Sequence, residues 1–223
     1  MGFIATTSPV SATDVTPPPT DPETTTTSST IPQLRFRDIK VISRVRTKDN
    51  VVFITIDDGF TPTDELAKLL KRYKIPITTF AKPRQISLNK RWFLSQDNMT
   101  FENHTVNHTP LSTRSLSFQR REICNANKQI RRLTGQRPVY FRPPGGSFNN
   151  VTKKAMAKCG IERLIMWSVI AEKNKLHIPN GKLQKGDIIL MHYINSTAST
   201  LELLLTKMKA DGMRPALLRD YLK

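Results

Sequence analysis

The sequence predicts an α/β fold built on a parallel sheet or barrel. Strand-like and helix-like segments alternate from about residue 33 onward, and such alternation implies parallel strands joined by right-handed crossovers. Residues 51–59 (VVFITIDDG) are an apolar, β-branched run that ends in two carboxylates and a glycine. This pattern is typical of a strand buried on both faces, with polar groups at the end where α/β proteins place their chemistry.

The first half of the domain follows from hydrophobic spacing. After the strand at residues 51–56, residues 63–73 form a helix, because Leu66, Leu69 and Leu70 recur at helical spacing. Acidic residues at its start and basic residues at its end suit the helix dipole. Residues 77–80 (ITTF) and 99–102 are the next two strands, separated by a short helix at residues 88–94.

The second half continues the alternation. Residues 112–133 form a long polar helix with an apolar face that includes Ile123 and Ile130. A strand at residues 139–142 precedes a helix at residues 151–158, which Gly160 ends. The apolar runs at residues 161–169 and 188–192 are expected to be further strands, and residues 199–210 a final helix.

Composition divides the chain in two. Residues 1–34 are rich in Thr, Ser and Pro and contain too little apolar surface to fold, so we expect a disordered segment or stalk. Residues 35–223 are expected to be one folded domain. The start of the chain lacks a basic and apolar leader. We nevertheless expect an extracytoplasmic protein, secreted or associated with the cell wall, whose true start lies upstream.

The folded part is strongly basic. The whole chain carries +17, and residues 1–34 contain three acidic residues and no Lys or Arg, so the remainder carries +17 − (−3) = +20. Such a domain associates with polyanions. The charge is scattered and no aromatic residues interleave with it, which argues against specific nucleic-acid binding. An anionic cell-wall polymer is the expected partner of this surface. No apolar run is long enough to span a membrane, and we expect a monomer.

The two cysteines, Cys124 and Cys159, lack the C-x-x-C spacing of a structural zinc site. They form either one disulfide or two buried thiols, and sequence alone leaves both alternatives open.

Acidic and histidine side chains follow several predicted strands. Asp57 and Asp58 end the strand at residues 51–56, and His104 and His108 (HTVNH) follow the strand at residues 99–102. The i, i+4 spacing places two imidazoles on one side of a helical turn, where they can share a metal. With Asp58 as third ligand the set suits a catalytic Zn²⁺, and Co²⁺ or Mn²⁺ would also fit.

Two further motifs add polar groups at strand ends. In the motif FRPPGG, Arg142 lies at the end of a predicted strand. The two prolines that follow stiffen the loop, and the two glycines allow the backbone to approach a ligand closely. GDIILMHYI places His192 at the end of an apolar strand. Each feature alone has a structural explanation, but three of the four histidines lie at predicted strand ends, which favours a site.

TIDDG, HTVNH, RPPGG and LMH, in this order and at these separations, resemble the motifs of the polysaccharide deacetylases, the NodB-homology domain or carbohydrate esterase family four. The resemblance covers residues 51–221, and secreted actinobacterial members are especially similar. It implies a distorted (β/α) barrel. It also implies metal-dependent hydrolysis of N-acetyl, or O-acetyl, groups on a polysaccharide such as peptidoglycan or a chitin-like glycan.

The resemblance implies roles for residues that hold the metal and activate water. Asp58, His104 and His108 match the metal ligands. Asp57 matches the general base that deprotonates a metal-activated water, and Arg142 matches the arginine that keeps this base ionised and oriented.

Other residues match groups that contact the substrate. The backbone N–H of Gly145 is expected to help hold the oxyanion, and His192 matches the general acid that protonates the departing sugar amine. Leu190 matches the leucine of the acetyl-methyl pocket. Trp167 is the retained tryptophan of the fourth motif and is expected to bind substrate.

Two departures from the family pattern bear on activity. Gly145 stands where the family commonly has an aromatic residue. The fourth motif, MWSVIAEKNK, lacks the usual aspartate, which pairs with the catalytic histidine, and the second tryptophan. Glu172 is the candidate substitute for that aspartate. An alternative hypothesis is therefore a non-catalytic or weakly active relative that binds glycan or cell wall, and a third is a polyanion-binding protein with a vestigial site.

Overall fold

The structure is a computed structural model that describes residues 1–2 and 35–222. The prediction of disorder for residues 1–34 therefore falls almost entirely outside the described residues. The strands are β1 (Lys40–Ile42), β2 (Val51–Asp58), β3 (Ile77–Ala81), β4 (Met99–Asn103), β5 (Tyr140–Phe141), β6 (Arg163–Ile165), β7 (Val169–Glu172), β8 (Lys175–His177), β9 (Ile188–His192) and β10 (Arg214–Pro215). The α-helices are α1 (Asp64–Arg72), α2 (Pro83–Leu88), α3 (Lys90–Leu94), α4 (Leu116–Thr134), α5 (Asn150–Lys158), α6 (Thr197–Ala210) and α7 (Leu218–Tyr221).

The strands form one curled sheet in the order β1-β6-β5-β4-β3-β2-β9-β7-β8, with β10 paired to the start of β2. All of these pairs are parallel except the β7–β8 hairpin. The register places Asp57 directly opposite His192 on β9 and opposite Phe80 on β3. The predicted α/β architecture is thus confirmed, and the carboxyl ends of β2, β4 and β9 meet at one edge.

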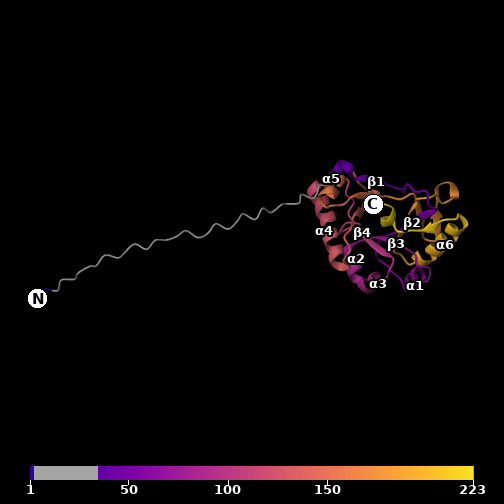
Figure 1. The fold of residues 1–223 in the computed structure, drawn as a ribbon, viewed down its shortest axis with the longest axis horizontal. Helices are drawn as coiled ribbons and strands as arrows, with labels where there is room; N and C mark the ends of the chain where they lie inside the picture. The colour runs from indigo at the N-terminus through magenta and orange to yellow at the C-terminus, as the bar shows by residue number, and fades with distance from the viewer. Residues whose placement is uncertain (3–34, 223) are drawn as a thin grey trace, which may run out of the picture. The chain divides into compact units, whose positions relative to one another are not determined.

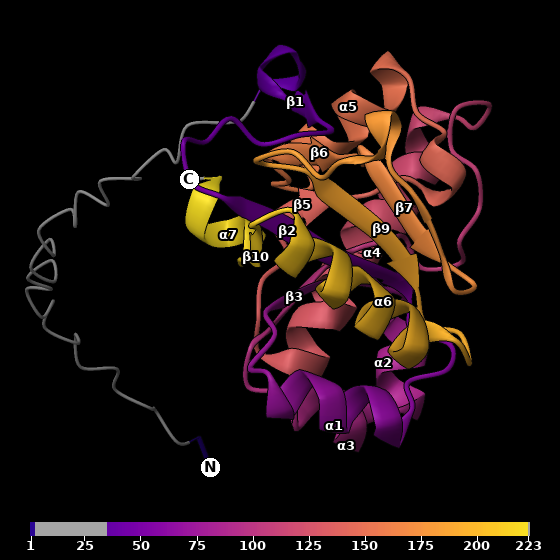
Figure 2. The same ribbon diagram turned by 90° about the vertical axis from the view of Figure 1, so that its right-hand side faces the viewer.

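Helices α1 to α6 pack on the outside of the curled sheet, whereas α7 packs on its inner side through Leu218 and Tyr221, which cluster with Phe53 (Figures 1 and 2). Helices α4 and α5 contact each other on one side, and α1 contacts α6 on another. β2 is buried along almost its whole length, as its apolar run predicts, and contributes Val52, Ile54 and Ile56 to the largest core cluster. The central strand that ends in Asp57 and Asp58 is therefore held rigidly from both faces.

Helix boundaries follow the local sequence. The Thr63 hydroxyl accepts a hydrogen bond from the Leu66 N–H and begins α1, and Ser115 does the same for α4 through Phe118. Gly135, in a left-handed conformation, ends α4. No helix among residues 35–222 has the length and apolarity needed to cross a membrane.

One predicted strand is wrong. Residues 161–169 divide into β6, which lies between β1 and β5, and β7, which pairs with β9. Between them, the Met166 N–H still bonds to Ile42 beside β6 and the Ser168 N–H to Ile188 on β9. The carbonyls of Ile165 and Met166 accept hydrogen bonds from Arg142 at this crossing. The predicted helix at residues 88–94 corresponds to α3, and the short elements α2, β1, β8, β10 and α7 were not predicted.

Cys124 on α4 and Cys159 at the end of α5 form a disulfide. This settles the choice between a disulfide and two thiols that sequence left open. The bond ties together two helices on the same side of the sheet.

Candidate active site at the carboxyl end of the central strands

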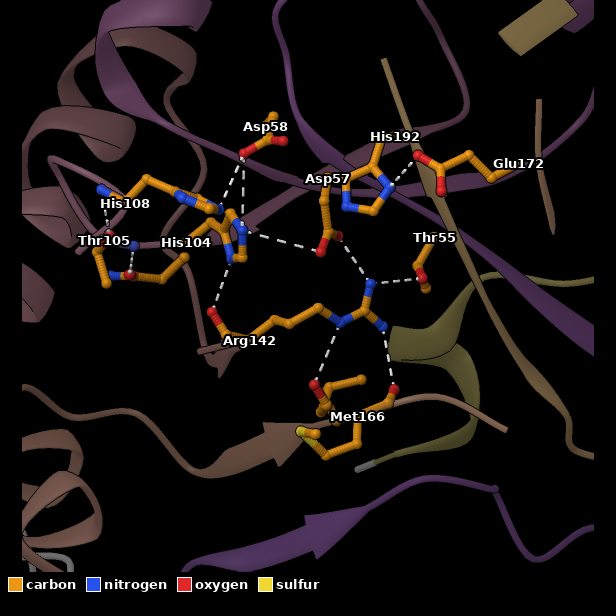
Figure 3. Close-up of polar contacts among 12 residues, drawn as sticks. Thr55, Asp57, Asp58, His104, Thr105, His108, Arg142, Met166, Glu172 and His192 are labelled. Atoms are coloured by element: carbon orange, nitrogen blue, oxygen red, sulfur yellow. Dashed lines mark hydrogen bonds and ion pairs between the residues drawn. The ribbon is translucent and has the colours of Figure 1, made fainter. Parts of the chain in front are cut away.

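Asp57 and Asp58 reach the same site although they are adjacent in a strand. Successive strand residues normally point to opposite faces. Asp58, however, has a left-handed backbone with φ of 72°, and Gly59 continues the turn with φ of 89°. Asp tolerates this conformation better than most residues. As a result, Asp57 Oδ2 and Asp58 Oδ1 each lie 3.8 Å from His104 Nε2 (Figure 3).

His104 and His108 lie on a loop directly after β4. The predicted helical turn is wrong: Thr105 and His108 have left-handed φ angles of 65° and 60°, and residues 104–108 are not helical. The Thr105 N–H donates to Asn103 Oδ1 and the His108 N–H to Thr105 Oγ1, both at 2.9 Å. These local bonds replace helical ones, and the two imidazole rings still meet, with centroids 4.9 Å apart.

The predicted ligand set converges. Ligand atoms of Asp58, His104 and His108 all lie within 4.8 Å of one another, and Asp58 Oδ1 is 3.3 Å from His108 Nε2. Asp58 Oδ1 is buried and has no hydrogen-bond partner among the described residues. A buried carboxylate oxygen facing two imidazoles fits a divalent cation. The residues present therefore suit the metal that the motifs imply.

The protonation and the ring orientation of His104 suit metal binding. Burial lowers its pKa, against the raising effect of Asp57 and Asp58. Its Nδ1 lies 2.8 Å from the carbonyl oxygen of Arg142, so Nδ1–H donates to this oxygen and Nε2 is left as the acceptor that faces Asp58. This is the usual outer contact of a metal-binding histidine.

Arg142 is fully buried and contacts Asp57 directly. Its Nη1 donates to Asp57 Oδ1 and to Thr55 Oγ1, both at 2.7 Å. Nε and Nη2 donate to the carbonyls of Ile165 and Met166. Burial lowers the pKa of Arg142, and Asp57 opposes this. The guanidinium is therefore held by four acceptors and fixes the orientation of Asp57 (Figure 3).

His192 lies across the site from the histidine loop and contacts Glu172. Glu172 Oε1 is 3.2 Å from His192 Nδ1, and this nitrogen has no well-aligned hydrogen bond among the described residues. The contact is thus an ion-pair approach rather than a linear hydrogen bond. Glu172 ends β7, where Ile170 and Glu172 are partly exposed while Val169 and Ala171 are buried. Glu172 therefore points to the site from the neighbouring strand (Figure 3).

The hairpin that carries Glu172 is tied to helix α6. Asn174, in the β7–β8 turn, donates its N–H to Thr200 Oγ1 at 3.0 Å and accepts from Ser199 Oγ at 2.6 Å. Thr197 of α6 donates its hydroxyl to the His192 carbonyl at 2.7 Å, so the same helix contacts both the end of β9 and the hairpin that carries Glu172.

The three predicted substrate contacts have defined places. Leu190 is buried on β9, two residues before His192 and on the same face of the strand. Gly145 has φ of 59°, and a Cβ there would meet no atom within 4 Å. The space beside Gly145, where the family commonly has an aromatic side chain, is thus open. Trp167 packs against Gly146 and stacks 5.7 Å from the Arg142 guanidinium.

Sequence reasoning missed Thr55 as part of the site. Its hydroxyl donates to the Ile189 carbonyl and accepts from Arg142. The available signal was a lone hydroxyl in an apolar strand, two residues before Asp57 and therefore on the same face.

The profile of the family described as "Polysaccharide deacetylase" matches residues 44–164, more than half of the chain. This chain belongs to the polysaccharide deacetylase family. The family assignment agrees with the motifs at Asp57–Asp58, His104–His108 and Arg142 and with the curled sheet on which they lie.

The chain is also similar in sequence to two individual proteins. It is 32% identical to an uncharacterised protein of Streptomyces coelicolor over 82% of this chain and 77% of that protein. It is 26% identical to the peptidoglycan-N-acetylmuramic acid deacetylase PdaA of Bacillus subtilis, over 74% of this chain and 69% of that protein.

Among solved structures, the chain resembles a CE4 family pseudoenzyme from Bacillus anthracis with 25% identity and a TM-score of 0.70. The match covers 82% of this chain and 69% of that one. A mutant of the same pseudoenzyme, described as having restored enzymatic activity, matches with 27% identity and the same TM-score. The fold is thus shared by active and inactive relatives, so activity depends on individual side chains.

Proposed function

We propose that this protein is a metal-dependent hydrolase that removes N-acetyl groups from a peptidoglycan or chitin-like polysaccharide. The observation that carries the proposal is the convergence of Asp58, His104 and His108 beside a second carboxylate, Asp57, held by a buried arginine. O-acetyl groups are a second substrate of the same chemistry.

Asp58, His104 and His108 would hold one divalent ion, Zn²⁺ first, with Co²⁺ or Mn²⁺ as substitutes. When bound, the ion supplies Lewis-acid chemistry, lowering the pKa of water and polarising the acetyl carbonyl. The orphaned Asp58 Oδ1 and the Nε2 orientation of His104 support this assignment.

The chain's own residues would move the protons. Asp57, paired with and oriented by Arg142, takes the proton of the attacking water as general base. The Gly145 N–H faces the developing oxyanion, and Leu190 lines the space for the acetyl methyl group. His192 gives a proton to the departing sugar nitrogen, and Glu172 supports its protonated form as the absent aspartate does in relatives. Trp167 braces the Gly146 loop and Arg142.

The test is acetate release from N-acetylglucosamine oligomers and from peptidoglycan by the zinc-loaded protein. Chelator and Asp57→Asn should each abolish release while the Asp57→Asn protein still binds stoichiometric metal. Absence of turnover on every acetylated glycan, with metal bound, would contradict the proposal.

A second candidate is a non-catalytic wall-binding relative. It is favoured by the missing fourth-motif aspartate and by likeness to a pseudoenzyme. This candidate predicts sedimentation with cell walls that Asp57→Asn and His192→Ala leave unchanged, and no acetate release. Contacts of the +20 domain with an anionic wall polymer would weaken with added salt in either case.

An extracytoplasmic location is part of the proposal. The Cys124–Cys159 disulfide supports it, because such bonds persist in oxidising compartments. The Bacillus subtilis relative is named as a deacetylase of peptidoglycan, a polymer that lies outside the cytoplasm. Fractionation of cells that express the natural protein tests it.

A further inference from the structure

An asparagine precedes each of the two histidines proposed as metal ligands: Asn103 before His104 and Asn107 before His108. Both asparagines are hydrogen-bonded to helix α4. Asn103 Nδ2 donates to the Ile123 carbonyl at 2.8 Å and to Asn127 Oδ1 at 2.5 Å. One face of α4 therefore holds both ends of the ligand loop.

Asn107 is held by a single carboxylate. Its backbone N–H donates to Glu122 Oε2 at 2.9 Å and its side-chain Nδ2 donates to Glu122 Oε1 at 2.7 Å. Glu122 is only 5% exposed and forms no ion pair among the described residues. Both oxygens of this buried carboxylate, which has no ionic partner among the described residues, thus accept hydrogen bonds from Asn107 of the loop. Burying a charge without an ionic partner is costly, so general stability is a poor explanation for its placement.

The loop needs this support because it lacks regular structure. Thr105 and His108 adopt left-handed conformations that non-glycine residues rarely hold without outside contacts. Within the loop, only short-range bonds to Asn103 and Thr105 fix the backbone. The contact from Glu122 comes from 15 residues away and acts on the residue next to His108.

From this geometry we propose that Glu122 is a positioning residue: it holds Asn107, and through it the imidazole of His108, at the distance from Asp58 that a divalent ion needs. The inference rests on the proposed metal site. Groups that orient metal ligands typically change metal affinity by roughly 10–100-fold when they are lost.

The test compares Glu122→Gln with Glu202→Gln, an exposed glutamate on α6 that serves as a matched control. Glutamine keeps the shape of Glu122 but must turn one NH₂ group toward an N–H donor. We expect zinc affinity, measured by competition with a chromophoric chelator, to fall roughly 10–100-fold in Glu122→Gln and to stay within twofold in the control. Affinities are measured on folded protein, and the melting temperature of each metal-free variant is recorded separately.

Asn107→Ala provides a second route, because it removes the Nδ2 contact and keeps the backbone N–H. If Glu122 acts through Asn107, the losses of zinc affinity in Glu122→Gln and Asn107→Ala are not additive in the double variant. Wild-type affinity in Glu122→Gln, with or without a lower melting temperature, would overturn the inference and leave the proposed function standing. A wild-type protein that binds no stoichiometric zinc would overturn both.

Discussion

Glu172 Oε1 lies 3.2 Å from His192 Nδ1, which places a carboxylate beside the proposed general acid of a chain that lacks the family's fourth-motif aspartate. The two residues come from β7 and β9, which are neighbours in the sheet. Glu172 is the last residue of β7 and lies on the same face of that strand as Ile170. Under the proposed function, Glu172 takes the place of that aspartate beside the retained histidine.

The first prediction concerns this pair. Glu172→Gln should lower kcat at least about tenfold, with little change in KM. A general acid as a whole accelerates a reaction by roughly 10²–10⁴-fold, so this is a partial loss of its effect. The reason is that a neutral amide no longer supports protonated His192 or fixes its ring. Steady-state acetate release measures both constants, with Glu202→Gln as control. In the double variant with His192→Ala, kcat should equal that of His192→Ala alone; an additional loss would contradict the pairing.

The second prediction concerns the buried Asp57–Arg142 pair. Arg142→Met should abolish activity and lower the free energy of unfolding by about 3–5 kcal/mol, because it leaves the buried Asp57 carboxylate unpaired. Urea unfolding of the metal-free protein measures this. Adding Asp57→Asn should restore part of the stability but none of the activity. Arg132→Met, on the exposed side of α4, is the control and should change neither quantity.

The third prediction concerns Glu102, a fully buried carboxyl that accepts hydrogen bonds from Val139, Tyr140 and Arg219. Burial raises the pKa of Glu102, and Arg219 opposes the rise. Because the folded pKa is raised, the folded state takes up this proton more readily than the unfolded chain, whose glutamate pKa is about 4.3. Its contribution to stability is therefore most favourable below that pH and is lost as pH rises through the folded pKa.

Arg219→Met should raise the pKa of Glu102 further. The loss in free energy of unfolding that this substitution causes should therefore be largest at neutral pH. We expect a loss of about 3 kcal/mol at pH 7 that shrinks at pH 5, measured by urea unfolding. With Glu102→Gln in the background, the cost of Arg219→Met should no longer depend on pH. Equal costs at both pH values in the wild-type background would count against this account.

The fourth prediction concerns the disulfide between Cys124 and Cys159, which are separated by 35 residues. Chain-entropy arguments assign about 4 kcal/mol of stability to a loop of this length. Replacing both cysteines with alanine should lower the free energy of unfolding by about this amount, with metal affinity unchanged, because the bond lies between α4 and α5 and not at the ligands. A dithiol reductant should destabilise the wild type and leave the double-alanine variant unaffected.

Much of the fold could be predicted from the sequence because the patterns that determine it are local. The run that forms β2, the spacing of leucines in α1 and the glycine after α4 each act over a few residues. The division of residues 161–169 into two strands could not be predicted from the sequence. The chain switches there from a partner beside β6 to a partner on β9, and Arg142, distant in the sequence, donates to the carbonyls of Ile165 and Met166 at the switch.

The sequence by itself determined which groups are present and at which strand ends: two aspartates, the two histidines of one loop, Arg142 and His192. Only the tertiary structure decided how they are used. The left-handed turn at Asp58 brings two adjacent carboxylates to one side, Glu122 accepts hydrogen bonds from Asn107 of the non-helical loop, and β7 brings Glu172 to His192. These contacts join residues on different elements, and their distances are set by packing of the whole sheet, which local sequence patterns do not encode.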